Sequence, residues 1–254
     1  RGTAAGFYLR LKGNRHLFVT PGVPYEMEGM LRDYIMPRLR EAVGAGACVR
    51  RAFVKVYGLP ESEINHRIRP LLDRARNPLL GLLPDQGTIT IEIVATGKTP
   101  EEAETLIEAD KAALRAELGP AIISEDGKGL PEVVVALLAE QKMTVAIAEV
   151  GTGGLVAARI TGVAGAERWF KGGSVVALGD ERGEPETLVK ALAAREATAA
   201  DIGVGVGPII VPEDSKPSNP YGLVDVVVNV QGQETCQTLR FNGAPARVRG
   251  WAAD

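Results

Sequence analysis

The first fifty residues predict one short strand and one helix. Leu17 to Val19 is a short apolar run, and the segment 20–24 after it contains two prolines and a glycine, which favours a rigid turn. From about Tyr25 the apolar side chains recur at helical spacing along one stripe: Met27, Met30, Leu31 and Tyr34. Pro37 interrupts this pattern, so we expect the helix to kink or break near Met36.

The next stretch alternates strand-like and helix-like patterns and predicts a compact βαββα module. Ala52 to Tyr57 alternates apolar and charged residues, as a half-buried strand does. A helix that begins near Pro60 has an apolar stripe at helical spacing: Ile64, Ile68, Leu71 and Leu72. Two further strands are predicted at 79–83 and 89–95, and a capping box at 99–102 opens a second helix.

From residue 127 onward the two kinds of pattern alternate, which is typical of an α/β domain. Helices are predicted over three ranges: 131–141, 155–160 and 185–195. Strands are predicted over five ranges: 144–148, 174–176, 202–206, 224–230 and 235–241.

Composition is that of a soluble globular protein and excludes several other classes. Hydrophobic residues make up 45% and charged residues 24% of the 254 residues, which is enough to bury substantial cores. No apolar run approaches the ~18 residues of a membrane span, so we expect no membrane association. Cys48 and Cys236 lie far apart and offer neither a disulfide framework nor a zinc spacing, so we expect a cytoplasmic location.

Charge is distributed unevenly along the chain. Residues 1–76 contain 14 Lys and Arg against 7 Asp and Glu, whereas residues 77–254 contain 15 against 25. A basic N-terminal part could attract a phosphate-bearing ligand or an acidic neighbour, but solvated and internally paired arginines are the simpler interpretation.

The most informative segment runs from Thr144 to Gly154 and reads Thr-Val-Ala-Ile-Ala-Glu-Val-Gly-Thr-Gly-Gly. A strand that enters a helix through a glycine-rich turn presents backbone N–H groups to an anion or a developing oxyanion. In form the segment resembles the Ala-Glu-Ser-Cys-Thr-Gly-Gly motif of the CinA (competence/damage-inducible) family, whose C-terminal domain is a nicotinamide mononucleotide deamidase in its active members. The matching residues are Ala148, Glu149, Thr152, Gly153 and Gly154.

Further motifs extend the resemblance along the chain. The run Pro-Gly-Val-Pro-Tyr-Glu-Met at 21–27 is similar to the last third of the family's N-terminal, molybdopterin-binding-like domain, and 53–123 resembles its KH-like middle domain. The resemblance implies an α/β protein in three parts. These are a partial molybdopterin-binding-like domain (1–46), a KH-like βαββα module (47–126) and a C-terminal three-layer α/β domain related to the deamidases (127–254).

The glycine-rich segment departs from the family at its reactive position. Val150 and Gly151 replace Ser-Cys, and the serine is the family's nucleophile. An isopropyl group can neither attack an amide nor accept a proton. The family's tyrosine falls at Ala177, its following lysine falls nearest Arg182, and its Thr-Gly-Ile-Ala-Gly-Pro loop contracts to Gly-Val-Gly-Pro at 205–208.

Two interpretations are open for the other residues of the turn. Thr152 carries the turn's one hydroxyl and is the candidate for a replacement nucleophile, although in the family it belongs to the binding shell. Glu149 could orient a ribose or amide group, or cap the backbone N–H groups of the turn, and the two roles are compatible. The predicted ligand-binding set is Glu149, Gly151, Thr152, Gly153, Gly154 and Arg182.

In the N-terminal part the resemblance implies three nucleotide-cleft candidates: Gly22, Pro24 and Glu26. The alternative for Glu26 is a structural one, an acid in a first helical turn that the helix dipole favours. The strand and loops that form most of the family's nucleotide pocket are absent from the sequence. His16 and His66 are the only histidines and are isolated, so we predict no metal site and no cofactor.

Three functions are compatible with this sequence. The first is a CinA-like protein related to nicotinamide mononucleotide deamidases and catalytically impaired by Val150, so whether the chain is an enzyme stays open. The alternatives are an active amidohydrolase that uses another hydroxyl, and an ADP-ribose pyrophosphatase if the N-terminal half is restored. We expect nicotinamide mononucleotide or a related nucleotide as ligand.

Two partner expectations complete the prediction. An incomplete N-terminal domain would expose the apolar faces of 17–19 and of the Met27 and Met30 stripe, so we expect a homodimer. The KH-like module lacks a Gly-x-x-Gly loop and has few aromatic residues for stacking, so we do not expect it to bind nucleic acid.

Overall fold

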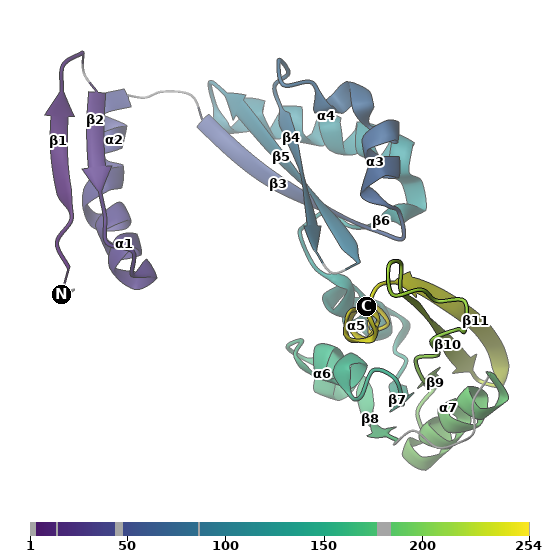
Figure 1. Ribbon diagram of the computed structural model, residues 1–254. Coiled ribbons are helices and arrows are strands. Elements are labelled where there is room, and N and C mark those ends of the chain that lie inside the picture. The colour runs from purple at the N-terminus through teal and green to yellow at the C-terminus, as the bar shows by residue number, and fades with distance from the viewer. Residues whose placement is uncertain (1–3, 14, 44–47, 86, 177–183, 254) are drawn as a thin grey trace. The chain divides into compact units, whose positions relative to one another are not determined.

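The computed structural model describes residues 4–13, 15–43, 48–85, 87–176 and 184–253 (Figure 1). The chain divides into two compact units, one of Arg1–Arg50 with Ala95–Thr105 and one of Arg51–Val94 with Leu106–Asp254. Over these ranges the helices and strands form a mixed α/β protein with three separate sheets, which confirms the predicted fold class. The predicted domain boundaries at 46 and 126 stay a prediction.

The N-terminal part consists of a β-hairpin followed by a long helical segment. Strand β1 (Phe7–Leu11) pairs antiparallel with β2 (Arg15–Val19), and α1 (Pro24–Met30), the π-helical turn η1 (Leu31–Ile35) and α2 (Met36–Val43) follow. On one face of the hairpin the rings of Tyr8 and Phe18 stack with centroids 4.7 Å apart, and Tyr34 meets Tyr8 edge-on at 6.4 Å. The predicted strand at 17–19 is therefore part of β2, and β1 lies outside the prediction.

The helical segment continues through Pro37 instead of breaking before it. Proline has no N–H to donate, and in a regular α-helix its ring clashes with the carbonyl four residues earlier. Here the turn before Pro37 widens to a π-helix, in which the amide of Met36 donates to the carbonyl of Leu31, five residues back. The wider turn accommodates the proline and lets the chain continue as α2.

The second sheet has the strand order β4-β5-β3-β6 and contains the predicted βαββα module. Its elements are β3 (Cys48–Tyr57), α3 (Glu61–Arg67), η2 (Arg69–Leu72), β4 (Leu79–Asp85), β5 (Thr88–Gly97), α4 (Pro100–Leu118), η3 (Gly119–Ala121) and β6 (Ile122–Ser124). The capping box forms as predicted, since the amide of Glu102 donates to Thr99 Oγ1 at 3.2 Å. The fully buried side chains include Val54, Ile64, Ile68, Ile91, Ile93 and Leu114.

The third sheet has the order β11-β10-β9-β7-β8, with β7 parallel to both of its neighbours and β10 antiparallel to β9 and β11. Its strands are β7 (Val145–Glu149), β8 (Phe170–Val175), β9 (Ile202–Val206), β10 (Tyr221–Val230) and β11 (Gln233–Asn242). Its helices are α5 (Leu130–Gln141), α6 (Leu155–Thr161), η4 (Ala166–Arg168), α7 (Glu184–Thr198) and α8 (Pro245–Trp251).

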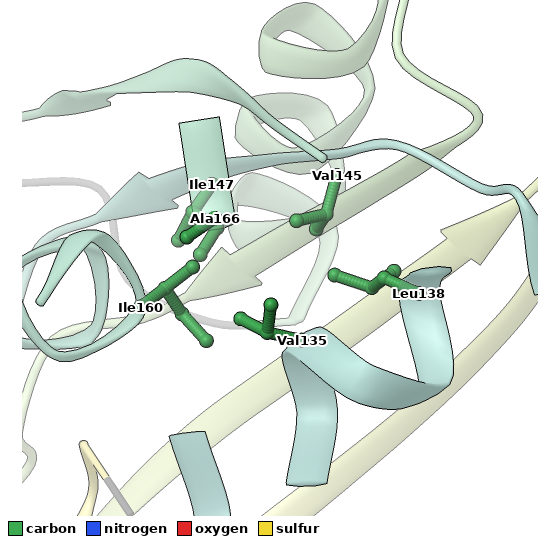
Figure 2. Close-up of a cluster of buried hydrophobic side chains, with 6 residues drawn as sticks. All are labelled: Val135, Leu138, Val145, Ile147, Ile160 and Ala166. Atoms are coloured by element: carbon green, nitrogen blue, oxygen red, sulfur yellow. The ribbon is translucent and has the colours of Figure 1, made fainter. Parts of the chain in front are cut away.

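Successive residues of β7 point into two different cores, so this domain has three layers. On one face Val145 and Ile147 join side chains from α5 and α6 in a cluster that Figure 2 shows: Val135, Leu138, Val145, Ile147, Ile160 and Ala166. On the other face Ala146 and Ala148 pack with Ala194 of α7 and with Ala200. The alternation of strand side chains thus places helices on both sides of one sheet.

Helix α7 packs on β9 at very short distance because β9 contains glycines. A Cβ atom on Gly203 would lie 2.4 Å from the carbonyl oxygen of Ala191, and one on Gly205 would lie 2.4 Å from that of Thr187. Only residues without a side chain permit this approach of helix backbone to strand backbone.

Candidate functional site

The topology of the third sheet singles out the carboxyl end of β7. The chain leaves β7 through α6 to form β8 on one side, and it leaves β8 through α7 to form β9 on the other side. Ligand sites in open α/β sheets lie outside the carboxyl ends of the strands at such a switch point. Glu149 is the last residue of β7, so the glycine-rich turn 150–154 stands at this position.

The carboxylate of Glu149 is buried inside the turn and accepts four hydrogen bonds. Oε2 accepts from Thr152 Oγ1 at 2.6 Å and from the amides of Gly154 and Val156 at 3.0 and 3.1 Å, and Oε1 accepts from the amide of Ala157 at 2.8 Å. The residue is 1% exposed. Glu149 thus caps the N-terminus of α6 from within, which is the structural alternative that the sequence left open.

Thr152 carries the one hydroxyl of the turn, and this hydroxyl points inward. The residue has no exposed surface, and its hydroxyl donates to Glu149. Glu149 could accept its proton, as a general base does for a nucleophile. A nucleophile must also reach the substrate, and the burial of Thr152 leaves no such access in this conformation.

Val150, which the resemblance aligns with the family's serine nucleophile, is half-buried. Its amide donates to the carbonyl of Val206 at 2.9 Å, and the next amide, of Gly151, donates to that of Gly207 at 3.0 Å. These two bonds continue the pairing of β7 with β9 beyond the strand ends. The backbone at 150 and 151 is therefore held in place by the neighbouring strand.

The other predicted ligand residues of this turn differ in their surroundings. Gly153 and Gly154 have φ angles of +64° and +94°, the left-handed region that favours glycine. Gly154 lies against β8, since a Cβ atom there would be 3.2 Å from Cγ2 of Val175. Arg182 and Ala177 lie outside the described residues.

The N-terminal candidates lie in the first turn of α1 and just before it. Gly22 and Pro24 are exposed, Pro24 is the first residue of α1, and Glu26 is 8% exposed in its first turn. An acid in this place interacts favourably with the helix dipole. No structural observation tests the nucleotide-cleft interpretation of these three residues.

The start of β7 is fixed by a pair that sequence reasoning missed. Asp201 Oδ2 accepts from both the amide and the hydroxyl of Thr144 at 2.7 Å, 57 residues away in the chain. These bonds hold the pKa of the Asp201 carboxyl below its usual value, and the bond from the Thr144 hydroxyl has the largest effect. Only a signal of long-range pairing could have revealed this contact, because both residues look like ordinary strand-end polar residues.

The described residues offer neither a metal-binding cluster nor a membrane-spanning helix. No group of three or more His, Cys, Asp or Glu side chains there is placed to hold a metal ion. None of the helices in the described ranges is both long and apolar enough to cross a bilayer.

Family models match two parts of the chain. The Damage-inducible protein CinA KH domain matches residues 51–124, and the CinA C-terminal domain matches residues 128–181. The second match includes β7, the glycine-rich turn, α6 and β8.

Relatives and solved structures bear the same family name. A CinA-like protein of Dictyoglomus thermophilum is 32% identical over 98% of this chain, which spans 64% of that relative. A CinA-like protein of Kosmotoga olearia is 31% identical over 99% of the chain, which spans 65% of it. Two crystal structures are similar to part of the chain. A CinA superfamily protein from Escherichia coli has a TM-score of 0.43 and 16% identity, and the match covers 49% of this chain and 82% of that one. A competence or damage-inducible protein from Enterobacter asburiae has a TM-score of 0.43 and 19% identity, and the match covers 50% of this chain and 92% of that one.

The two family models match 51–124 and 128–181, and these relatives align with nearly the whole chain, which spans 64–65% of their own length. The chain belongs to the CinA (competence/damage-inducible) family.

Proposed function

We propose that this chain is a relative of the nicotinamide mononucleotide deamidases in which the deamidase reaction is impaired. Deamidation needs a nucleophile, an acceptor for its proton and donors for the oxyanion. The observation that carries the proposal is the hydrocarbon side chain of Val150 at the carboxyl end of β7, on the switch point of the sheet.

The hydrogen bonding of the turn supports the same proposal. The carboxylate of Glu149 caps the start of α6 by accepting four hydrogen bonds, and one of these comes from the buried hydroxyl of Thr152. A substrate amide at the mouth of the turn would therefore meet Val150 and glycine backbone. A nucleotide could still be bound by the predicted set, but no attacking oxygen of the turn faces it.

Two assays of the purified chain test this proposal. Ammonia release from nicotinamide mononucleotide should be indistinguishable from the protein-free control. Turnover that persists in Thr152→Ala would show that a different group attacks, and turnover lost in Thr152→Ala would identify Thr152 as the nucleophile. Either result overturns the proposed impairment.

Calorimetry with nicotinamide mononucleotide addresses the second part of the proposal, retained binding. Measurable heat with a thermal shift would support a nucleotide-binding role without catalysis. No heat and no shift would leave an assembly role as the function of this domain. The complementary variant is Val150→Ser, which restores a hydroxyl at position 150 without changing its backbone bonds.

We also propose that the chain forms homodimers, and the hairpin supports this. Its outward face carries apolar side chains that are between 39% and 55% exposed: Phe7, Leu9, Leu11, Leu17 and Val19. A two-stranded sheet is marginal by itself, and a continuous apolar face of this kind favours association.

A further inference from the structure

Gly151 is buried next to the backbone that follows β9. A Cβ atom on Gly151 would lie 2.7 Å from the carbonyl oxygen of Gly207, 2.9 Å from the amide nitrogen of Ile209 and 3.0 Å from Cγ1 of Ile209. Two of these contacts are to backbone atoms, so a side-chain rotation cannot relieve them. Gly151 is not among the residues with positive φ, so space is what requires glycine here.

The segment 207–210 is held from the far side and has little room to recede. The amide of Gly207 donates to the carbonyl of Asp225 at 2.8 Å, and Ile210 and Leu223 exchange two bonds of 2.8 Å. Ile209 packs against the buried cluster of Val206, Val224 and Val248. Ile209 also lies close to Gly222, where a Cβ atom would be 3.0 Å from Cγ2 of Ile209, so there is little space for Ile209 to move toward β10.

The turn is held from its own side too. Its backbone is bonded to Val206 and Gly207, the carbonyl of Glu149 accepts from the amide of Val176 at 2.8 Å, and the carboxylate of Glu149 ties the turn to α6. The backbone of residues 150 and 151 is therefore held by 206–207 on one side and by the capped start of α6 on the other.

We infer that Gly151 is a positioning residue for this site: the absence of a side chain there lets 207–209 lie against the turn and sets where the side chain of residue 150 points. Any side chain at 151 displaces the turn or 207–209, and residue 150 moves with it. This role rests on the proposed site, but it determines accessibility at position 150 whether or not the chain binds a nucleotide or releases ammonia.

The test measures the thiol-labelling rate of Val150→Cys in a chain that also carries Cys48→Ser and Cys236→Ser. Adding Gly151→Ala should change that rate by about fivefold or more, because a displaced turn alters exposure of the thiol. The matched control is Gly205→Ala, a glycine of equally close contact whose Cβ would meet Thr187 on α7 and not the turn. It should leave the rate within about twofold.

A second variant keeps the test decisive if Gly151→Ala does not fold. Ile209→Ala removes side-chain atoms that lie against Gly151 and adds none. It loosens the packing of 207–209 on the turn and should raise the labelling rate of Val150→Cys by about threefold or more. Unchanged rates in both variants, or an equal change in the Gly205→Ala control, would overturn the role of Gly151. None of these outcomes depends on catalysis or ligand binding, so the positioning role and the proposed function can fail separately.

Discussion

The buried carboxylate of Glu149 gives the sharpest prediction of a stability effect. Replacing it with glutamine keeps the shape of the side chain but turns one acceptor oxygen into an NH2 donor. The least costly orientation places this NH2 opposite the amide of Ala157, because Oε1 accepts one bond there and Oε2 accepts three. The buried amide of Ala157 then faces the NH2 donor of the glutamine. The three bonds to the other oxygen become bonds to a neutral acceptor.

The magnitude follows from these four bonds. An unsatisfied buried donor costs about 1–3 kcal/mol, and bonds to charged acceptors exceed neutral ones by about 1 kcal/mol each. Removing a buried charge recovers several kcal/mol of desolvation penalty. The losses sum to about 4–6 kcal/mol and the recovered desolvation offsets part of them, so we expect Glu149→Gln to lower the free energy of unfolding of this domain by about 1–3 kcal/mol.

Urea denaturation followed by tryptophan fluorescence is the assay. Both tryptophans of the chain, Trp169 and Trp251, lie in the C-terminal domain, so the signal reports on this domain. Hydrogen exchange should show loss of protection at the amides of Gly154, Val156 and Ala157 in particular. The control is Glu196→Gln, the same change at an exposed position of α7, which should stay within about 0.5 kcal/mol of wild type. A Glu149→Gln chain as stable as this control, with unchanged protection, would refute the capping role.

Three further predictions concern other parts of the molecule. Gly205→Ala should destabilise the C-terminal domain by about 3 kcal/mol, because its Cβ would meet the carbonyl oxygen of Thr187 at 2.4 Å; a urea midpoint equal to wild type would contradict this. Hydrogen bonds to Asp126, of which the one from Lys128 has the largest effect, lower the pKa of its carboxyl from 3.8 to about 2. The stability that these bonds contribute to the fold is therefore present above pH 3.8 and is lost as pH falls toward 2. Lys128→Met should raise this pKa in a carboxyl NMR titration, and an unchanged midpoint would contradict the assignment. In sizing experiments the chain should be larger than a monomer and Leu9→Glu should shift it toward the monomer, whereas a monodisperse wild-type monomer would disprove the homodimer.

Much of the fold could be predicted because local patterns and tertiary structure agree. The βαββα order of the middle module and the alternation after residue 127 both emerge from apolar spacing and capping residues. The start of β8 could not be predicted from the sequence, because Gly172 and Gly173 have no strand preference. A Cβ on Gly173 would lie 2.1 Å from the carbonyl oxygen of Ile147, so tertiary packing requires a residue that local pattern disfavours.

The candidate site was located from sequence, but its internal bonding was not. The glycine-rich turn after a buried strand identified the position, and the resemblance identified Val150 as the altered residue. The capping role of Glu149 depends on which way its side chain turns, which no pattern specifies. The close contact of Gly151 with 207–209 joins segments more than fifty residues apart, and spacing along the chain contains no signal for it.

Ammonia release from nicotinamide mononucleotide tests the central claim most directly, with a serine-containing deamidase of the family as positive control. The wild-type chain should give no signal above the protein-free background at any substrate concentration, because Val150 supplies no attacking oxygen. Sustained, protein-dependent ammonia release from the wild-type chain would contradict that account.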